Sequence, residues 1–322
     1  MDLRQIETFV RVAELGSFTR ASVALGVAQP ALSRQVRSLE LEFRQALLLR
    51  NGRGVTVTEA GRVLLEQGRG VLHQVQRIRE ELGRARDSLA GRVVLGLPPS
   101  LSKTLAIPLA RSFHSALPQA TLSIAEGLST TMQQALVAGR VDVALLFDAA
   151  PEPDIDARAL GALDLLLVRR HANGAAAVGA GAPRAVSLRE LARQPLIIPS
   201  RPNAIRMLVE AALNAIGAQP RIAFEVDAVG AIPDLVADGR GAAVLTRGAV
   251  DAFDDPARFS LRGIGDPPLR CRLSLAVSAR RPPTRTLALA CELISRCATR
   301  MPGVRPIEEA RGRATTAGSR AR

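Results

Sequence analysis

The sequence predicts a protein of the α+β or α/β class, built from a small helical domain, one long helix and a larger domain of strands and helices. Three patterns predict this order. In residues 1–43, apolar residues recur every three or four positions. In residues 59–90 they keep a heptad spacing. From residue 91, short apolar runs alternate with amphipathic segments. A length of 322 residues suffices for about two domains, each with its own core.

Residues 1–43 are expected to form three short helices. Gly16 ends the first, Ser17 is a good N-cap for the second, and Gly26 ends that one after two turns. Pro30 lies in the first turn of the third helix, where its missing N–H is not needed. The buried faces are predicted to be Leu3, Ile6, Val10 and Ala13, then Phe18, Ala21 and Leu25, then Leu32, Val36, Leu39 and Phe43.

A β-hairpin, or wing, is predicted next, because residues 51–57 (NGRGVTV) combine turn residues with an alternating Val-Thr-Val run. Thr58 then caps a long helix. Its apolar positions keep heptad spacing, with one glycine gap at Gly68, and this narrow stripe favours pairing with a second helix in a homodimer or homotetramer. The alternative is a helix that packs on its own domain. The residues assigned to the dimer helix are Leu64, Val71, Val75, Ile78 and Leu82.

From Gly91 the alternation of strands and helices predicts a parallel or mixed sheet covered on both sides. Strands are expected at residues 93–97, 122–125, 143–147, 165–168, 196–198, 222–226, 242–245 and 273–277. The Ala/Gly-rich residues 171–183 are expected to form a loose loop. Residues 302–322 are rich in arginine and poor in apolar residues, and they are expected to be a disordered basic tail.

The composition excludes several classes of protein. An apolar share of 47% excludes wholesale disorder, and three cysteines are too few for a disulfide framework. The net charge of +13 leaves nucleic acid or an acidic ligand open as a partner. The longest stretch without a charged residue has fourteen residues, too short to span a membrane, and the charged N-terminus lacks the apolar core of a signal peptide. We therefore expect a cytoplasmic protein without a membrane partner.

No catalytic or metal site is predicted. The three histidines fall in different elements, and no His or Cys pair has the spacing of metal ligands. Gly239 and Gly241 resemble half of a dinucleotide-binding motif, but Val244 replaces the third glycine, so a helix C-cap fits better. We expect neither a cofactor nor an enzymatic activity.

The third helix has the most specific pattern. Helix, sharp turn and helix form a helix-turn-helix, whose second helix enters the major groove of double-stranded DNA. Once its core face is subtracted, the third helix presents hydrogen-bond donors and no acid before Glu40, whereas an ordinary solvated face would mix acids with arginines. The residues assigned to DNA binding are Gln29, Pro30, Ala31, Ser33, Arg34 and Arg37, with Arg50 and Arg53 of the wing for backbone phosphates or the minor groove.

These segments also resemble a known family. "GSFTRASVALGVAQPALSRQVRSLE" and "RNGRGVTVTEAG" closely resemble the signature of LysR-type transcriptional regulators, and "GRVDVALLF", "LIIPSRPN" and "VADGRGAAVLTRGAV" resemble the family's effector-binding domain. "GLPPSLS", "AEGLS" and "PSRPN" are most similar to the branch of the nitrogen assimilation control regulator. Ala28, Arg44 and Leu48 depart from the family pattern, in which serine, glycine and phenylalanine are common.

The resemblance implies a winged helix-turn-helix DNA-binding domain (1–58), a linker and dimerisation helix (59–90) and an effector-binding domain (91–301) of two Rossmann-like subdomains of periplasmic-binding-protein type. Subdomain I would comprise 91–162 and 266–301, and subdomain II 163–265. A small polar effector would bind between them at the C-terminal ends of strands. The implied effector residues are Ser100, Ser102, Ser129, Thr130, Phe147, Ser200, Asn203, Asp227 and Thr246.

A regulator of this type would bind a dyad-symmetric operator, with RNA polymerase as a further partner. Asp227 would oppose a carboxylate effector unless Arg201 compensates, so the charge of the effector stays open. The main alternative is a small-molecule-binding protein of periplasmic type without a DNA role. The expected absence of a signal peptide and the N-terminal helix-turn-helix speak against it.

Overall fold

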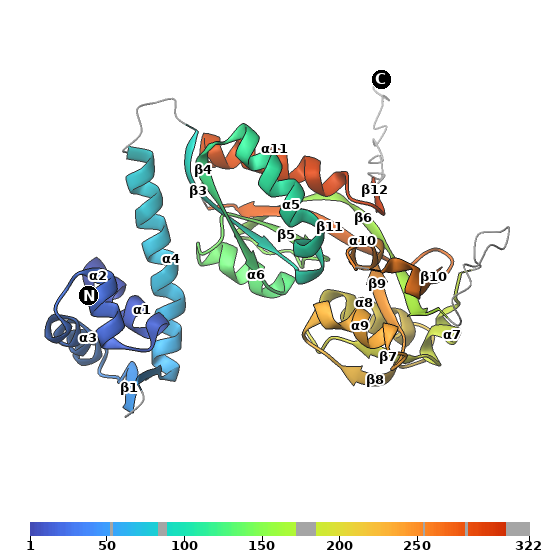
Figure 1. The fold of residues 1–322 in the computed structure, drawn as a ribbon, viewed down its shortest axis with the longest axis horizontal. Helices are drawn as coiled ribbons and strands as arrows, with labels where there is room; N and C mark the ends of the chain where they lie inside the picture. Colours follow the sequence, from blue (N-terminus) through green and yellow to red (C-terminus); the bar gives the residue numbers. More distant parts are fainter. Residues whose placement is uncertain (52–53, 83–88, 172–184, 254, 281–282, 307–322) are drawn as a thin grey trace, which may run out of the picture.

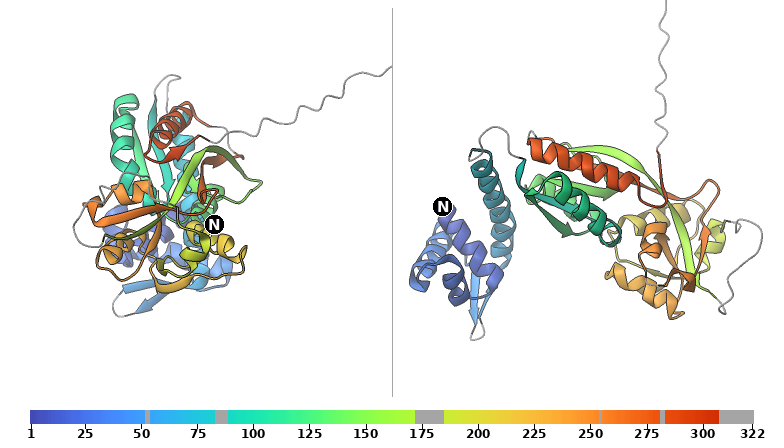
Figure 2. Two further views of the ribbon diagram at one scale, coloured as in Figure 1. Left: turned by 90° about the vertical axis from the view of Figure 1, so that its right-hand side faces the viewer. Right: turned by 45° about the horizontal axis from the view of Figure 1, so that its top comes forward.

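The computed structural model describes residues 1–322 except 52–53, 83–88, 172–184, 254, 281–282 and 307–322. A helical domain lies at one end and a two-lobed domain at the other, with the long helix α4 (Glu59–Leu82) between the helical domain and the nearer lobe (Figure 1). The right-hand view of Figure 2 shows the same order. The helical domain, the long helix and the two-lobed domain thus follow one another in space as they do along the chain.

The helical domain has the predicted elements: α1 (Leu3–Leu15), α2 (Phe18–Leu25), α3 (Gln29–Phe43) and a hairpin of β1 (Leu48–Asn51) and β2 (Gly54–Val57). Phe9, Leu32 and Leu39 form the centre of its core, each fully buried. Asp2 caps α1 in a capping box with Gln5, which satisfies two backbone N–H groups at the helix start.

Two departures from the family pattern have local structural consequences. Ala28 provides no side-chain cap for α3, and Pro30 in the first turn removes one of the donors that would need a cap. Arg44 ends α3 with a φ of 52°, the left-handed conformation that glycine adopts without strain, so the usual turn into the hairpin is kept. Leu48 is buried in the core of the domain.

Helix α4 packs its first half on the helical domain. Leu64 and Leu72 join the core of that domain, and a Cβ atom added at Gly68 would lie 3.0 Å from a methyl group of Ile6 on α1. Leu64 is thus partly buried against its own domain, and Gly68 lies against α1 of the same chain. The glycine gap in the stripe is the place where α1 approaches closely.

The two-lobed domain is organised around an eight-stranded mixed sheet in which β10, β6, β11, β5, β3 and β4 are neighbours in that order. The chain passes from the first lobe to the second along β6 and returns between β10 and β11 (Figure 1). All eight predicted strands are present, as β3 (Ala90–Leu97), β4 (Gln119–Glu126), β5 (Val143–Phe147), β6 (Ile155–Arg170), β7 (Pro195–Ile198), β8 (Arg221–Glu225), β9 (Ala243–Thr246) and β11 (Arg270–Ser278). The sequence did not predict β10 (Phe259–Gly263), nor the length of β6, which has 16 residues.

Helices cover both faces of the sheet in the first lobe. The helices of this domain are α5 (Pro99–Ala116), α6 (Ser129–Val137), α7 (Leu188–Ala192), α8 (Ala204–Asn214), α9 (Ile232–Ala237), α10 (Arg247–Asp251) and α11 (Arg285–Thr299). Alternate residues of β5 face opposite sides: Leu145 packs in the core with α5 and α11, and Leu146 packs in the core with α6. Both faces are thus buried, as the near-continuous apolar runs predicted.

The predicted disordered tail begins too early. Residues Val304–Arg305 form strand β12, which pairs with β6 opposite Leu163 and Ala162. Arg305 Nε donates to Asp164 Oδ2 at 2.8 Å. The rest of that prediction, residues 307–322, and most of the predicted loop at 171–183 lie outside the described residues.

We expect Phe9→Ala to lower the free energy of unfolding of the helical domain by about 3–5 kcal/mol, because it leaves a cavity in a closely packed core. Val23→Ala is the control: Val23 is 82% exposed on α2, so its change should stay within about 0.5 kcal/mol. Hydrogen exchange of α1–α3 in increasing urea measures this domain within the full chain. Equal midpoints for the two variants would contradict the assigned core.

Candidate DNA-binding surface and effector cleft

The outer face of α3 is exposed and basic. Helix α1 lies between α3 and α4, which places α3 on the side away from the two-lobed domain (Figure 1). Gln29, Pro30, Arg34 and Arg37 are exposed, while Ala31 and Ser33 are partly buried. Within the described part of the chain, neither Arg34 nor Arg37 forms an ion pair with a carboxylate.

The first acid on α3, Glu40, is bound to the start of the wing. Glu40 Oε1 accepts hydrogen bonds from the backbone N–H groups of Leu47 (2.9 Å) and Leu48 (3.1 Å), at the start of the wing. Glu40 therefore fixes the wing against α3. Its carboxylate is thereby engaged by the backbone of the wing, although Glu40 follows Arg37 by one helical turn.

The contribution of the wing arginines stays a prediction. Arg50 lies in β1, paired in register with Val55 of β2, but its side chain and the whole of Arg53 fall outside the described residues.

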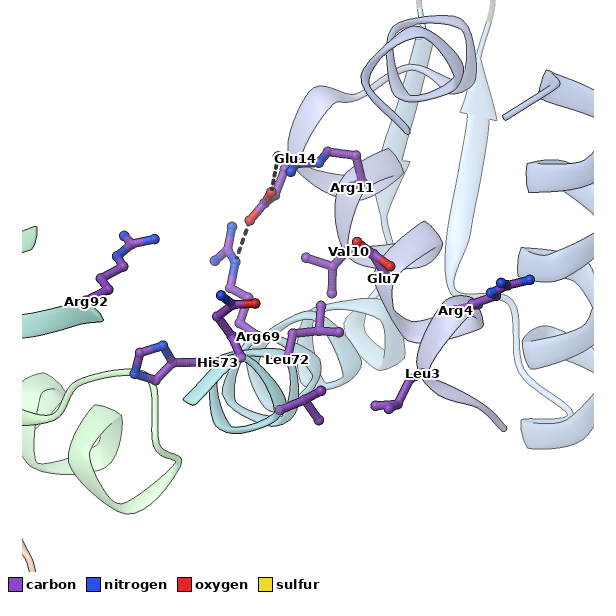
Figure 3. A pocket seen from close by; sticks show the side chains of 12 residues that line it. Leu3, Arg4, Glu7, Val10, Arg11, Glu14, Arg69, Leu72, His73 and Arg92 are labelled. Carbon is purple, nitrogen blue, oxygen red and sulfur yellow. Dashed lines mark hydrogen bonds and ion pairs between the residues drawn. The ribbon is translucent and has the colours of Figure 1, made fainter. Parts of the chain in front are cut away.

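A second exposed surface runs along α4. Val71 and Ile78 are 41% and 55% exposed, and Val63, which the heptad pattern missed, is 58% exposed. Val75 is partly buried beside a groove between α1 and α4 (Figure 3), and the side chain of Leu82 is outside the described residues. The outward apolar stripe thus passes through Val63, Val71 and Ile78, at spacings of eight and seven residues that keep one side of a helix.

The two lobes meet at a small cavity of about 30 Å³. Four of the nine predicted effector residues line it: Ser100, Ser129, Phe147 and Asn203. The remaining lining consists of apolar side chains, namely Pro98, Pro99, Leu128, Pro199, Ala204, Ile205, Val229, Ile232, Val244 and Leu245.

Two of these polar side chains already stabilise the backbone around the cavity. Ser129 Oγ accepts a hydrogen bond from the Phe147 N–H at 2.9 Å, and Asn203 Oδ1 caps α8 by accepting from Ile205 N at 3.0 Å. Asn203 thus caps a helix and also lines the cavity.

The other five predicted residues do not line the cavity. Ser102 and Thr246 are buried, and Thr130 and Asp227 are exposed. Asp227 Oδ1 instead accepts the N–H of the fifth, Ser200, at 2.9 Å. All nine residues were predicted because each follows the end of a strand. That position along the chain does not determine whether a side chain points into the cleft or toward its own loop.

Contacts between the lobes hold the cleft closed. Thr104 Oγ1 of α5 donates to the Gly248 carbonyl of α10 at 3.2 Å, and Lys103 Nζ lies 5.9 Å from the centre of the Phe253 ring. These contacts join the two lobes beside the cavity.

A buried ion pair supports the loop that forms one wall of the cleft. Arg206 and Glu210 of α8 pair with each other, and Arg201 adds a second ion pair to Glu210 at 2.8 Å. Burial opposes ionisation of Glu210, but the hydrogen bonds from Arg206 and Arg201 hold its pKa below the usual value. Arg206 also donates to the Pro199 carbonyl at 3.2 Å, which ties the wall to α8.

Other kinds of site find no support among the described residues. No three His, Cys, Asp or Glu side chains gather there as a metal site requires. Burial raises the pKa of Cys271 to about 12 and that of Cys291 to about 11, so both remain protonated thiols at neutral pH. None of the described helices combines the length and the apolar character needed to cross a lipid bilayer.

Comparison with known proteins agrees with this geometry. Residues 3–62 match the family model for bacterial regulatory helix-turn-helix proteins of the lysR family, and residues 86–298 match the LysR substrate binding domain. The nitrogen assimilation regulatory protein nac of Klebsiella aerogenes is 32% identical over 87% of this chain and 90% of its own length. The regulator BbuR of Bordetella bronchiseptica is 30% identical over 88% of this chain and 86% of its own length.

Solved structures share the fold. A full-length OxyR variant from Pseudomonas aeruginosa has a TM-score of 0.68 at 24% identity and covers 95% of this chain and 100% of its own. CbnR in complex with its target DNA has a TM-score of 0.68 at 24% identity and covers 92% and 100%. The chain belongs to the LysR family: it is a DNA-binding transcriptional regulator with an effector-binding domain.

Proposed function

We propose that this regulator reads a dyad-symmetric operator by inserting α3 of two subunits into successive major grooves. The main support is the exposed face of α3, where Gln29, Arg34 and Arg37 present donors and the carboxylate of Glu40 is engaged by the backbone of the wing. Arginine pairs with guanine and glutamine with adenine through two hydrogen bonds each, which gives sequence preference. Arg50 and Arg53 would add phosphate or minor-groove contacts.

The subunits would pair through α4, with the stripe of Val63, Val71 and Ile78 against the same stripe of a second chain. Apolar side chains exposed on one side of a long helix favour a partner helix. Two α3 helices related by a twofold axis would then face two half-sites of the operator. Each assembly would be a homodimer or a homotetramer.

The effector would bind between the lobes, in the cavity lined by Ser100, Ser129, Phe147 and Asn203, after the lobes separate. The apolar lining favours a compact metabolite with an apolar body and a few polar atoms. Ser102, Thr130, Ser200, Asp227 and Thr246 would contribute only if opening turns them toward the cleft. We expect the protein to act in the cytoplasm as a regulator and not as an enzyme, with RNA polymerase as a further partner.

Arg34→Ala should weaken binding to an operator selected by the wild-type protein from a randomised DNA pool by about 1–3 kcal/mol, because it removes a base contact. Base preference should relax at one position in each half-site. Arg11→Ala is the matched control, since Arg11 belongs to the same domain but lies beside the groove between α1 and α4. Equal gel-shift titrations for Arg34→Ala and wild type would refute the assignment of α3 to the groove.

Ile78→Glu should dissociate the oligomer, because it places a charge in the middle of an apolar helix pair. Light scattering after size exclusion should show the mass of a smaller species, and operator affinity should fall with it. Val23→Glu, on an exposed position of α2, should keep the wild-type mass. An intact oligomer for Ile78→Glu would show that the stripe is not the subunit interface.

Ser100→Val should weaken effector binding by about 1–3 kcal/mol, because it removes a hydroxyl donor from the cleft wall. Valine is similar in size to serine, so folding and basal DNA binding should not change. The ligand comes from a thermal-shift screen of small metabolites, and calorimetry measures its affinity. Thr130→Val is the control, because Thr130 is exposed and does not line the cavity. Equal losses in both variants, or no loss in Ser100→Val, would remove Ser100 from the site.

A further inference from the structure

A tight turn follows α11, the last helix of the first lobe. Met301 is buried in the core of the two-lobed domain, and its carbonyl accepts a hydrogen bond from Val304 N at 3.3 Å. Pro302 and Gly303 are the two central residues of this turn, and Gly303 has a φ of 84°, the left-handed conformation that a type II turn needs at this position. The turn directs the chain back onto β6 as β12 (Figure 1). We call residues 301–305 the C-terminal clip.

Strand β6 carries a glycine where the C-terminal clip lies against it. A Cβ atom added at Gly161 would lie 2.6 Å from Val304 Cγ1 and 2.8 Å from the Arg305 carbonyl oxygen, so only glycine permits this approach. The three atoms nearest to the position of that Cβ atom all belong to the clip. Directly before Gly161, β6 has one extra residue relative to β11, a β-bulge of the kind that bends a strand. The clip therefore contacts β6 at a bend.

The same part of β6 is where the chain crosses from the first lobe to the second. Val304 and Arg305 pair with β6 directly before Asp164. Asp164 accepts hydrogen bonds from Arg305 Nε at 2.8 Å and from Arg270 Nε, at the start of β11, at 2.7 Å. Strand β6 takes the chain to the second lobe, and β11 begins where the chain returns. The carboxylate of Asp164 therefore joins the clip to both crossings.

The C-terminal clip also touches the second lobe. A Cβ atom added at Gly303 would lie 3.2 Å from the Cβ atom of Arg247, the first residue of α10. The next residue of α10, Gly248, is the one whose carbonyl accepts the hydrogen bond from Thr104 of α5. Figure 1 shows α10 at the junction of the two lobes. Two parts of the first lobe, α5 and the clip, thus contact the same end of one helix of the second lobe.

We propose that the C-terminal clip stabilises the closed arrangement of the two lobes. Separation of the lobes moves α10 away from Gly303 and changes the bend of β6 at the crossing, so it breaks contacts that the clip makes only in the closed form. The clip therefore raises the free energy of opening. An effector that binds the open form would bind more tightly to a chain without the clip, because less of its binding energy is used for opening. Only this consequence for the effector rests on the proposed function.

The effect of the clip on the lobes is tested in the protein without DNA or effector. Spin labels on noncanonical residues at the exposed positions Ile107 of α5 and Met207 of α8 report the distance between the lobes, with each labelled chain diluted into unlabelled protein. Gly161→Ala should displace the clip, because the atoms nearest to the added methyl group belong to the clip. The ratio of open to closed forms should rise at least about 2-fold, the effect of losing one hydrogen bond.

Gly263→Ala is the matched control. It also adds a methyl group to a glycine of a strand, but its Cβ atom would lie 3.8 Å from that of Ala185, which is ordinary van der Waals contact. The distance between the labels should therefore stay at the wild-type value.

A second pair of variants removes the clip by truncation. A chain that ends at Pro302 loses Gly303 and the pairing with β6, and its label distance should shift in the same direction as in Gly161→Ala. A chain that ends at Pro306 keeps the clip and should keep the wild-type distance. Wild-type distances in both Gly161→Ala and the chain ending at Pro302 would overturn the proposal. Equal shifts in the two truncated chains would also overturn it, because the effect would then belong to residues 307–322.

Combining the two changes distinguishes the clip from a distortion of β6 itself. Gly161→Ala in the chain ending at Pro302 should add no further shift, because the added methyl group no longer meets Val304 or Arg305. A further shift as large as the one in the full-length chain would show that alanine acts on β6, and would refute the role of the clip at Gly161. All these distances are measured without a ligand, so failure to find a metabolite that binds the cleft would refute only the proposed function.

Discussion

The packing of α4 on both the DNA-binding domain and the first lobe constrains the rest of the molecule. Gly68 lies against α1 and Gly70 lies against Ala138. Residues that are two positions apart in a helix point in directions about 200° apart. Each glycine weakens a helix by about 1 kcal/mol relative to alanine. Two of them here let backbone or side chains approach α4 closely on opposite sides. Between these two sides, Val71 and Ile78 are exposed on the side that we propose for a second subunit.

This division of faces explains why the sequence predicted a long interacting helix but not the partner of each residue. Heptad spacing says that one stripe is buried, and it is the same whether the partner is α1 or another chain. Leu64 was therefore assigned to the dimer although it packs on its own domain, and Val63 was missed. The exposed face of α3 was easier to predict from the sequence, because the spacing of its donors and the lack of an acid before Glu40 are both properties of a single helix.

The strands of the sheet were also predicted where the pattern is local and missed where it depends on a distant partner. Short apolar runs identify strands that are buried on both faces, such as β5. Strand β6 was found only at residues 165–168, because its first half, with Asp156 and Arg158, is partly exposed and lacks an apolar run. The short strand β12 is held by pairing with β6 and by the ion pair of Arg305 with Asp164, and neither contact is visible along the chain. Residues that depend on a distant partner were thus the ones the sequence could not place.

The charge of the effector also follows from contacts that the sequence does not reveal. Arg201 and Asp227 were the two candidates, and they are already engaged, with Glu210 and with the backbone of Ser200. The described lining of the closed cavity contains no ionisable side chain. Burying an ion there without a counter-charge would cost several kcal/mol. A neutral effector is therefore compatible with the closed form, whereas an ionised one requires an open cleft in which one of these pairs is exchanged for the ligand.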